Sequence, residues 1–389
     1  MAIQVFNILD FVVIIPLGPI LMRELNITTT QFGLLAASYK VSSGFISLFY
    51  STIGDLFDRK KLTMVCLFMF VLSTLFCAIA PNYTVLMFAR ILAGVFGGIL
   101  TPSVYAIIAD LILFERRGRA LGMIMASFSI SSTLGIPLGL MIAEAFSWRE
   151  TFHFIGAGAT LVMAANIWLL PSVPVKEKKI YRVGEQLKTM WNTFSDKEHL
   201  ESYVVMMCYT FSGFMLFPFL SPYAVHNVGL QESDLKYIYL VGGIFTIVMS
   251  RMAGRLTDSH GPLRVFFPAV MLSIPFVYLY TTVENLPLTQ LLIISTGFMV
   301  MINARFVPLM TMITKVPKEN KRGSFMGVLM ALRSFTAASA TAFTGFIITE
   351  DAQGNLVNFD LSGMISIGIS LFAIFFVLRL NSRIFTPTA

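Results

Sequence analysis

The sequence predicts an all-α membrane protein whose twelve transmembrane helices form two pseudo-symmetric six-helix halves. Three observations predict this class. Hydrophobic residues make up 56% of the 389 positions and charged residues only 13%, against roughly 25% charged residues in soluble domains. Apolar segments long enough to cross a bilayer recur along the chain, and short motifs of its first half return in its second half. A mean hydropathy of +0.77 argues against a single soluble core.

Each apolar segment is close to the length that a membrane requires. A bilayer core of about 30 Å is crossed by roughly 20 apolar residues of helix. The first segment has neither the basic start nor the small-residue cleavage site of a signal peptide, so we expect a retained spanning helix. The segments lie at residues 2–22, 32–54, 62–81, 84–110, 120–146, 151–171, 202–226, 234–257, 263–284, 288–313, 324–349 and 360–379.

Basic residues are distributed unequally between the two sides of the predicted membrane. If the N-terminus is cytoplasmic, twenty Lys and Arg residues fall inside and only Arg23, Arg149 and Lys236 fall outside. This asymmetry predicts a cytoplasmic (inner) membrane protein with both termini in the cytoplasm. The asymmetry also accounts for the net charge of +7. We therefore expect the lipid bilayer as a partner and do not expect nucleic acid.

One long polar connection divides the chain. We expect an N-terminal six-helix half at 1–171, a cytoplasmic linker at 172–201 and a C-terminal six-helix half at 202–389. The longest outside loop, 350–359, contains Gln-Gly-Asn and predicts a turn or a hairpin.

The two halves repeat one another. Asp55 and Asp258 occupy matching loops 203 residues apart, and Arg117-Gly-Arg-Ala-Leu-Gly matches Arg322-Gly-Ser-Phe-Met-Gly at an offset of 205. Ordered matches at nearly one offset indicate a duplicated six-helix unit. Parallel halves of this kind bind their substrate between them, near the middle of the membrane.

The loop between the second and third segments carries a family resemblance. Residues 51–61 read Ser-Thr-Ile-Gly-Asp-Leu-Phe-Asp-Arg-Lys-Lys, similar to the Gly-x-Leu-Ala-Asp-Arg-x-Gly-Arg-Lys loop of the major facilitator superfamily, with serine and aspartate in place of two glycines. The whole chain resembles this family, and most of all its 12-helix drug:proton antiporter and sugar-efflux branch. The resemblance implies a gating role for Asp55, Arg59, Lys60 and Asp258. The alternative is a solvated charge cluster that only fixes topology.

Two further elements resemble that branch. Arg90-Ile-Leu-Ala-Gly is similar to the family's Arg-x-x-Gln-Gly, without its glutamine, and the resemblance implies a role for Arg90 in proton coupling. On the fifth segment, Gly135, Pro137 and Gly139 resemble the antiporter signature, although Ile136 separates the first glycine from the proline. Close helix packing through small residues and a proline kink would give the same sequence.

Five charged residues lie deep in the predicted helices. Asp10 is the only deep acid, and Lys40, Arg90, Arg305 and Arg333 are the deep bases. A charge inside the bilayer is costly and faces a cavity or a partner, so each is a candidate functional residue. Lys40 and Arg90 are the expected partners of Asp10.

The expected cavity therefore holds one acid and up to four bases. Asn7 and Asn303 complete its polar candidates, beside Lys40, Arg305 and Arg333. Arg holds a carboxylate or phosphate through two parallel hydrogen bonds, so this balance suits an anionic or phosphate-bearing substrate better than a cationic drug. Some of the bases would serve equally as counter-ions of Asp10.

The functional expectation is a secondary active transporter that works by alternating access. The main hypothesis is proton-coupled efflux of a small organic or amphipathic molecule, with Asp10 gaining and losing the proton. The alternative is a transporter of organic anions or phosphate-bearing, lipid-like molecules, an exchanger or importer in which Asp10 is a structural counter-ion. A receptor that uses the same fold ranks below both.

Enzymatic chemistry is not indicated. The sequence contains no Walker-type glycine loop, no His/Cys metal cluster and no serine nucleophile motif, so we expect no cofactor and no metal. The expected partners are a small-molecule substrate and protons, and the expected state is a monomer. The four histidines, at helix ends or in loops, are interpreted as surface residues.

Overall fold

The computed structural model describes residues 1–53, 58–112, 123–124, 126–171, 188, 191–317 and 322–385. Within these ranges, 11 helices are long and apolar enough to cross a membrane, and the number is 12 if one bent pair forms a single span. This confirms the predicted all-α membrane class. The predicted linker, 172–201, lies largely outside the described ranges.

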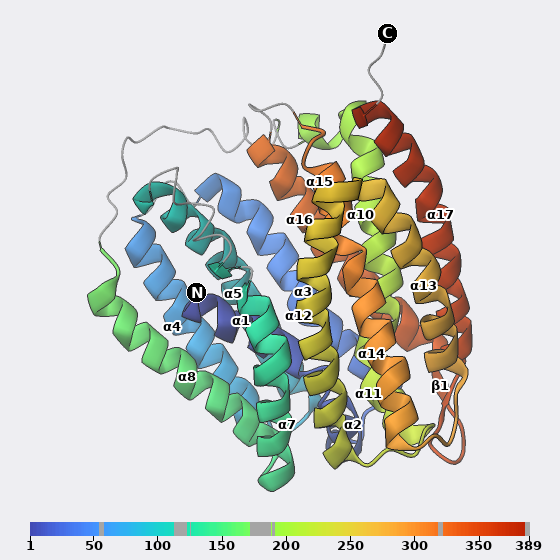
Figure 1. Cartoon of the computed structure of the whole chain (residues 1–389). Helices are drawn as coiled ribbons and strands as arrows, with labels where there is room; N and C mark the ends of the chain where they lie inside the picture. The colour runs from blue at the N-terminus through green and yellow to red at the C-terminus, as the bar shows by residue number, and fades with distance from the viewer. Residues whose placement is uncertain are drawn as a thin grey trace.

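Helices of the first part of the chain, blue to green in Figure 1, lie on one side of the bundle, and those of the second part, yellow to red, lie on the other. The first set consists of α1 (Ala2–Val13), α2 (Gly18–Leu25), α3 (Thr29–Ile53), α4 (Arg59–Ala78), α5 (Tyr83–Leu111), the π-helical turn η2 (Ser131–Gly135), α7 (Ile136–Ala145) and α8 (Trp148–Leu169). The second set consists of α10 (Lys197–Leu216), η3 (Phe217–Phe219), α11 (Leu220–His226), η4 (Glu232–Asp234), α12 (Leu235–His260), α13 (Pro262–Thr282), α14 (Leu288–Ala304), α15 (Phe306–Ile313), α16 (Arg322–Ile347) and α17 (Phe359–Phe385).

The first spanning segment is broken, whereas the sequence predicted one continuous helix over 2–22. Helices α1 and α2 meet at a bend of 56° across the four residues 14–17. Pro16 lacks an amide hydrogen and its ring crowds the preceding turn, and Pro19 begins the new helix. The break brings residues at the end of α1 next to the centre of the bundle.

Helix starts follow local capping chemistry. The side chains of Asp58, Asn82, Ser147 and Asp196 each accept a hydrogen bond from a backbone amide in the first turn of α4, α5, α8 and α10. These caps satisfy amides that have no partner inside the helix. The sequence therefore fixes these four starts locally, and packing determines how the helices are arranged.

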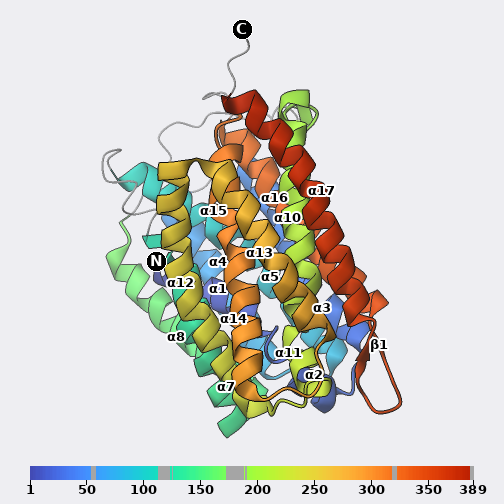
Figure 2. The ribbon, with the colours of Figure 1, turned by 45° about the vertical axis from the view of Figure 1, so that its right-hand side comes forward.

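Two tight helix contacts join the first and second parts of the chain. Helices α3 and α16 run antiparallel, and a Cβ built on Gly33 would lie 3.2 Å from the Cα of Gly345. Eleven residues further along α3, a Cβ built on Gly44 would lie 3.1 Å from the Cβ of Ser334. On the other side of the bundle, Gly243 of α12 packs against Thr133 of η2. Figure 2 shows α13, α14 and α17 in front of these central helices.

The end of the bundle that carries α2, α11 and a small hairpin is closed by polar contacts between the two parts of the chain. Glu350 accepts hydrogen bonds from the backbone amide and the hydroxyl of Thr29, at the start of α3. Arg23 pairs with Glu232, and Lys236 pairs with Glu144 at 2.8 Å. The hairpin is formed by β1 (Thr349–Glu350) and β2 (Leu356–Val357), as the sequence predicted for this loop.

The outward faces of α4, α8, α13 and α17 are apolar. Large side chains such as Leu161, Trp168 and Phe375 are 72%, 87% and 60% exposed, as a lipid-facing surface requires. One histidine departs from the expectation: His199 is buried, 2% exposed, where its ring donates a hydrogen bond from Nδ1 to the carbonyl of Thr193 and packs edge-on against Phe325.

Candidate functional site

Asp10 and Arg90 form an ion pair at the centre of the first half. Arg90 Nη1 lies 2.8 Å from Asp10 Oδ2 and 3.0 Å from the carbonyl oxygen of Asp10, and both side chains are fully buried. Thr74 Oγ1 of α4 donates to the second carboxylate oxygen at 3.1 Å. The chain thus compensates its deep acid with one of the two partners named from the sequence.

Aromatic rings enclose this pair. The guanidinium of Arg90 lies 4.8 Å from the ring centroid of Tyr39 and 5.9 Å from that of Phe152. Such contacts stabilise a cation that has few hydrogen-bond acceptors, and here Nε and Nη2 of Arg90 have none among the described residues. No signal in the sequence points to Thr74 or Tyr39, because a single hydroxyl or ring in an apolar helix is indistinguishable from packing.

Asn7 belongs to a second polar group one turn away. Its side-chain oxygen accepts from the hydroxyl of Tyr39 at 2.7 Å, and its amide nitrogen lies 3.1 Å from both the carbonyl of Gly97 and Thr101 Oγ1. Asn7 is 5% exposed. It ties α1 to α3 and α5.

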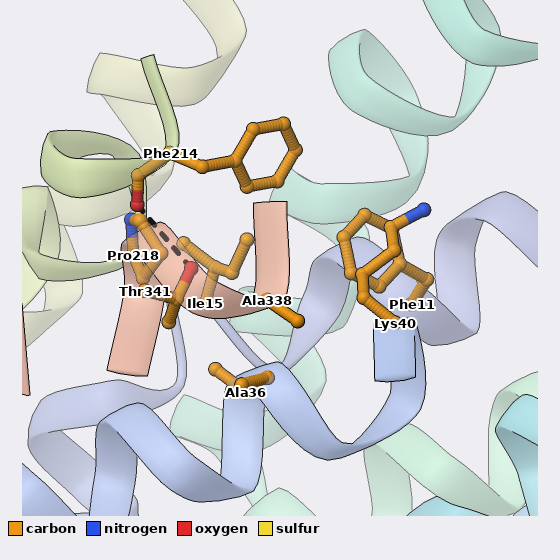
Figure 3. A pocket seen from close by; sticks show the side chains of 9 residues that line it. Phe11, Ile15, Ala36, Lys40, Phe214, Pro218, Ala338 and Thr341 are labelled. Atoms are coloured by element: carbon orange, nitrogen blue, oxygen red, sulfur yellow. Dashed lines mark hydrogen bonds between the residues drawn. The ribbon is translucent and has the colours of Figure 1, made fainter. Parts of the chain in front are cut away.

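A small pocket lies between the first and second parts of the chain (Figure 3). Its walls come from α1, the break after α1, and α3 on one side, and from α10, η3 and α16 on the other. Thr341 Oγ1 donates to the carbonyl of Phe214 at 3.2 Å across the second wall. The lining residues are Phe11, Ile15, Ala36, Ala37, Lys40, Phe214, Pro218, Ala338 and Thr341.

Adjacent residues connect the ion pair to the pocket. Asp10 and Tyr39 belong to the buried pair and its surroundings, while their neighbours Phe11 and Lys40 line the pocket. The rings of Phe11 and Tyr39 are 5.4 Å apart, and the ammonium of Lys40 lies 3.7 Å from the ring centroid of Phe11. A movement of Phe11 or Lys40 in the pocket would therefore also move Asp10 or Tyr39, which are their neighbours in the chain.

The deep bases of the second half have no acidic partner among the described residues. Arg305, 2% exposed at the junction of α14 and α15, bonds to Ser370 Oγ at 3.0 Å, and its Nε has no partner. Arg333 of α16 lies 5.0 Å from the ring centroid of Phe306. Asn303 accepts a hydrogen bond from Ser250 and so links α14 to α12.

The predicted gating residues are separated in space from this centre. Asp55 lies outside the described ranges. Arg59 Nε lies 3.2 Å from Asp110 Oδ2, and Lys60 Nζ donates to the carbonyl of Ile167 at 2.9 Å, so both bases join helices of the first half. Asp258 is exposed near the end of α12.

The residues of the fifth-segment signature face the first helix. A Cβ on Gly135 would come within 2.6 Å of Leu9, and one on Gly139 within 2.9 Å of Val13. Pro137 lies at the start of α7, directly after the π-helical turn, which widens the helix where the proline supplies no amide hydrogen. These residues allow α1 to approach η2 and α7 closely.

No group of three or more His, Cys, Asp or Glu side chains suited to a metal ion occurs in the described part of the chain.

Comparison with known proteins identifies a family whose model matches the chain. The sequence matches the family model described as Major Facilitator Superfamily over residues 1–341 and again over 202–385. Among solved structures, a bacterial homolog of the human lysosomal transporter Spinster, in an inward-facing and occupied conformation, has a TM-score of 0.74 at 16% identity, with 98% of this chain and 95% of that chain covered.

Two other solved structures show the same fold. A D-xylose-proton symporter has a TM-score of 0.75 at 14% identity over 96% of this chain and 95% of its own. The nucleoside transporter NupG has a TM-score of 0.74 at 13% identity, over 97% and 98%. At these identities the likeness concerns the fold.

Proposed function

Because this chain belongs to the major facilitator superfamily, we propose that it exports a small organic molecule across the cytoplasmic membrane by alternating access, coupled to protons. The family and the multi-pass helical fold make it a transporter of the secondary kind and not an enzyme. The two six-helix halves, residues 1–171 and 202–389, would rock about the site between them, with both termini in the cytoplasm. The proposed unit is a monomer.

The observation that carries the proposal is the position of the pocket. Five of its nine lining residues come from the first part of the chain and four from the second, so any relative motion of the halves opens or closes it. The contacts of Glu350, Arg23 and Lys236 close one end of the bundle. A closed end and a central pocket are what alternating access requires at one stage of its cycle.

Proton coupling is proposed for Asp10 and Arg90. In the intact pair, Arg90 and Thr74 both donate hydrogen bonds to the carboxylate of Asp10. Rearrangement of Phe11 and Lys40 around a substrate would shift α1 and α3, the helices that carry Asp10 and Tyr39. Separation of the pair would then favour protonation of the carboxyl, because a buried acid without its cation is costly to ionise.

The test is transport by the purified protein in liposomes under an imposed pH gradient. A ligand found by thermal stabilisation serves as the labelled substrate. We expect gradient-driven transport to be lost in Asp10→Asn, while exchange of labelled for unlabelled substrate at equal pH is retained. The matched control is Asp360→Asn, an exposed acid at the start of α17. Full gradient-driven transport by Asp10→Asn would contradict the proton role.

A second candidate is favoured by the complete burial of the pair. In this reading Asp10 is a structural counter-ion of Arg90 and the protein exchanges or imports its substrate. Asp10→Asn would then impair exchange as well as gradient-driven transport, and a double variant Asp10→Asn/Arg90→Gln would restore exchange, because no unpaired buried charge remains.

A further inference from the structure

The charges around the pocket do not balance. In the first half Arg90 has its counter-ion in Asp10. Lys40, Arg305 and Arg333 have no carboxylate within ion-pair distance among the described residues. Like charges gathered in a medium of low polarity are unfavourable unless an anion neutralises them.

The register of α3 and α16 places Lys40 and Arg333 on helices that face each other. Since Gly33 faces Gly345 and Gly44 faces Ser334, Lys40 lies opposite Ala338, and both line the pocket. Arg333 is five residues from Ala338 toward the start of α16, or about 7.5 Å along the helix axis, beyond the residues that line the pocket.

Arg305 extends the cationic region away from the pocket. The ring centroid of Tyr209 on α10 lies 5.7 Å from that of Phe306, the ring that Arg333 contacts. The partnerless Nε of Arg305 is buried. Phenol, guanidinium and ammonium groups together are donors suited to the oxygens of an anion.

The remaining walls of the pocket are apolar. Phe11, Ile15, Phe214 and Pro218 form its hydrophobic part, and Phe11 lies beside Lys40 (Figure 3). The pocket is about 10 Å³, which is room for about one water molecule. An apolar group therefore enters it only when the two parts of the chain move apart, as alternating access requires.

We propose that the substrate is an amphipathic organic anion whose carboxylate or phosphate end binds between Lys40 and Arg333 and whose apolar body lies between Phe11 and Phe214 once the pocket opens. The proposal rests on the transport function proposed above and names its substrate class. Because Lys40 belongs to the first half and Arg333 to the second, the anion joins the two halves when it binds. It also replaces the ring of Phe11 as the partner of the Lys40 ammonium.

The experiment compares four probes with one apolar body and different end groups. They are 2-naphthoate, 2-naphthyl phosphate, 2-naphthylmethylammonium and 2-naphthalenemethanol, and their binding to the full-length protein is measured by calorimetry in a neutral maltoside detergent. We expect the two anions to bind at least tenfold more tightly than the cation or the alcohol. The ratio between the affinities for 2-naphthoate and 2-naphthyl phosphate identifies the preferred end group. Equal or tighter binding of the cation or the alcohol would overturn the proposal.

Substitutions at Lys40 and Arg333 test whether these residues bind the anionic end group of the probe. Lys40→Gln and Arg333→Gln are each expected to weaken anion binding about ten- to a hundredfold and to leave binding of the alcohol unchanged. Lys40→Arg and Arg333→Lys, which keep the charge, retain most of the affinity. The matched control is Arg251→Gln, an exposed arginine in the spanning helix α12. Unchanged anion affinity in both glutamine variants would refute the assignment.

The outcomes separate substrate class from transport. If the anions bind through Lys40 and Arg333 but are not moved across liposomes with or without a pH gradient, the transport proposal fails and the site stands. If a cationic or neutral probe is transported and the anions are not, the transport function stands and the proposed substrate class is wrong.

Discussion

At the scale of single residues, the ion pair of Asp10 and Arg90 is the most demanding feature of the structure. Two buried charges lose their hydration, and only close contact and extra hydrogen bonds offset that cost. Here the offset comes from the 2.8 Å contact, from the hydroxyl of Thr74 and from the backbone carbonyl of Asp10 itself. The pair links α1 to α5, and Thr74 adds α4.

Removal of one partner is therefore expected to destabilise the fold strongly. Arg90→Gln leaves Asp10 charged, buried and unpaired, which we expect to cost about 3–5 kcal/mol. Arg149→Gln, which breaks a half-exposed pair with Glu24, is expected to cost about 1 kcal/mol or less. The measurement is reversible unfolding of both variants in mixed micelles. A similar decrease in the free energy of unfolding in the two variants would show that burial of the Asp10 pair carries no special cost.

At the scale of helices, departures from regular geometry determine where the helices meet. The break between α1 and α2 directs Phe11 and Ile15 toward the pocket, and the π-helical turn η2 positions Thr133 against α12. The close approach of α3 and α16 depends on Gly33 and Gly345, since backbone atoms fill the space that a side chain would take. Backbone atoms cannot move aside as a flexible side chain does.

A side chain at this contact should force the two helices apart. Gly345→Val would bring its side chain against the Cα of Gly33 and the carbonyl of Thr29, both 3.3 Å from a Cβ at this position. We expect spin labels on α3 and α16, at this end of the bundle, to report a longer distance than in the unsubstituted protein. Gly327→Ala is the control on the same helix, because nothing lies within 4 Å of its Cβ position. An unchanged distance in Gly345→Val would contradict the close-packing role.

At the scale of the whole molecule, the closed end is held by polar contacts that link the two parts of the chain. Glu350 binds the first amide of α3, where the positive end of the helix dipole favours a carboxylate. Arg23 with Glu232 and Lys236 with Glu144 add exposed pairs. Exposed pairs of this kind contribute little singly, and such a closure can open during a transport cycle.

Loss of the Glu350 contact should open this end more often. Glu350→Ala removes the acceptor of two hydrogen bonds from Thr29, and we expect about a five- to hundredfold rise in the open fraction. The measurement is the labelling rate of Ile15→Cys by a membrane-impermeant maleimide, with Cys66, Cys77 and Cys208 replaced by alanine. Asp351→Ala is the neighbouring control, because Asp351 accepts hydrogen bonds within its own turn, from Gln353 and Asn355. Equal labelling rates in the two variants would refute the role of Glu350 in closure.

The sequence alone determined the class of the protein, the segments that cross the membrane and the residues that are costly to bury. Those properties follow from local composition, since twenty apolar residues suffice for a span and a charge within them needs a partner wherever the helix packs. Asp10 and Arg90 could be named as partners for this reason. Thr74 and Tyr39 could not be named, because nothing in their local sequence distinguishes them from packing residues.

Only the tertiary structure decided which partner each buried charge has. It assigned Arg90 to Asp10 and set Lys40 over Phe11, although both bases were equally available in the sequence. It broke the first segment and brought Phe11 and Ile15 to a pocket whose other wall lies roughly two to three hundred residues further along the chain. The physical reason is that the attraction between two charges depends on the distance between them in space. Helix packing sets which side chains from separate segments come within a few ångströms of one another.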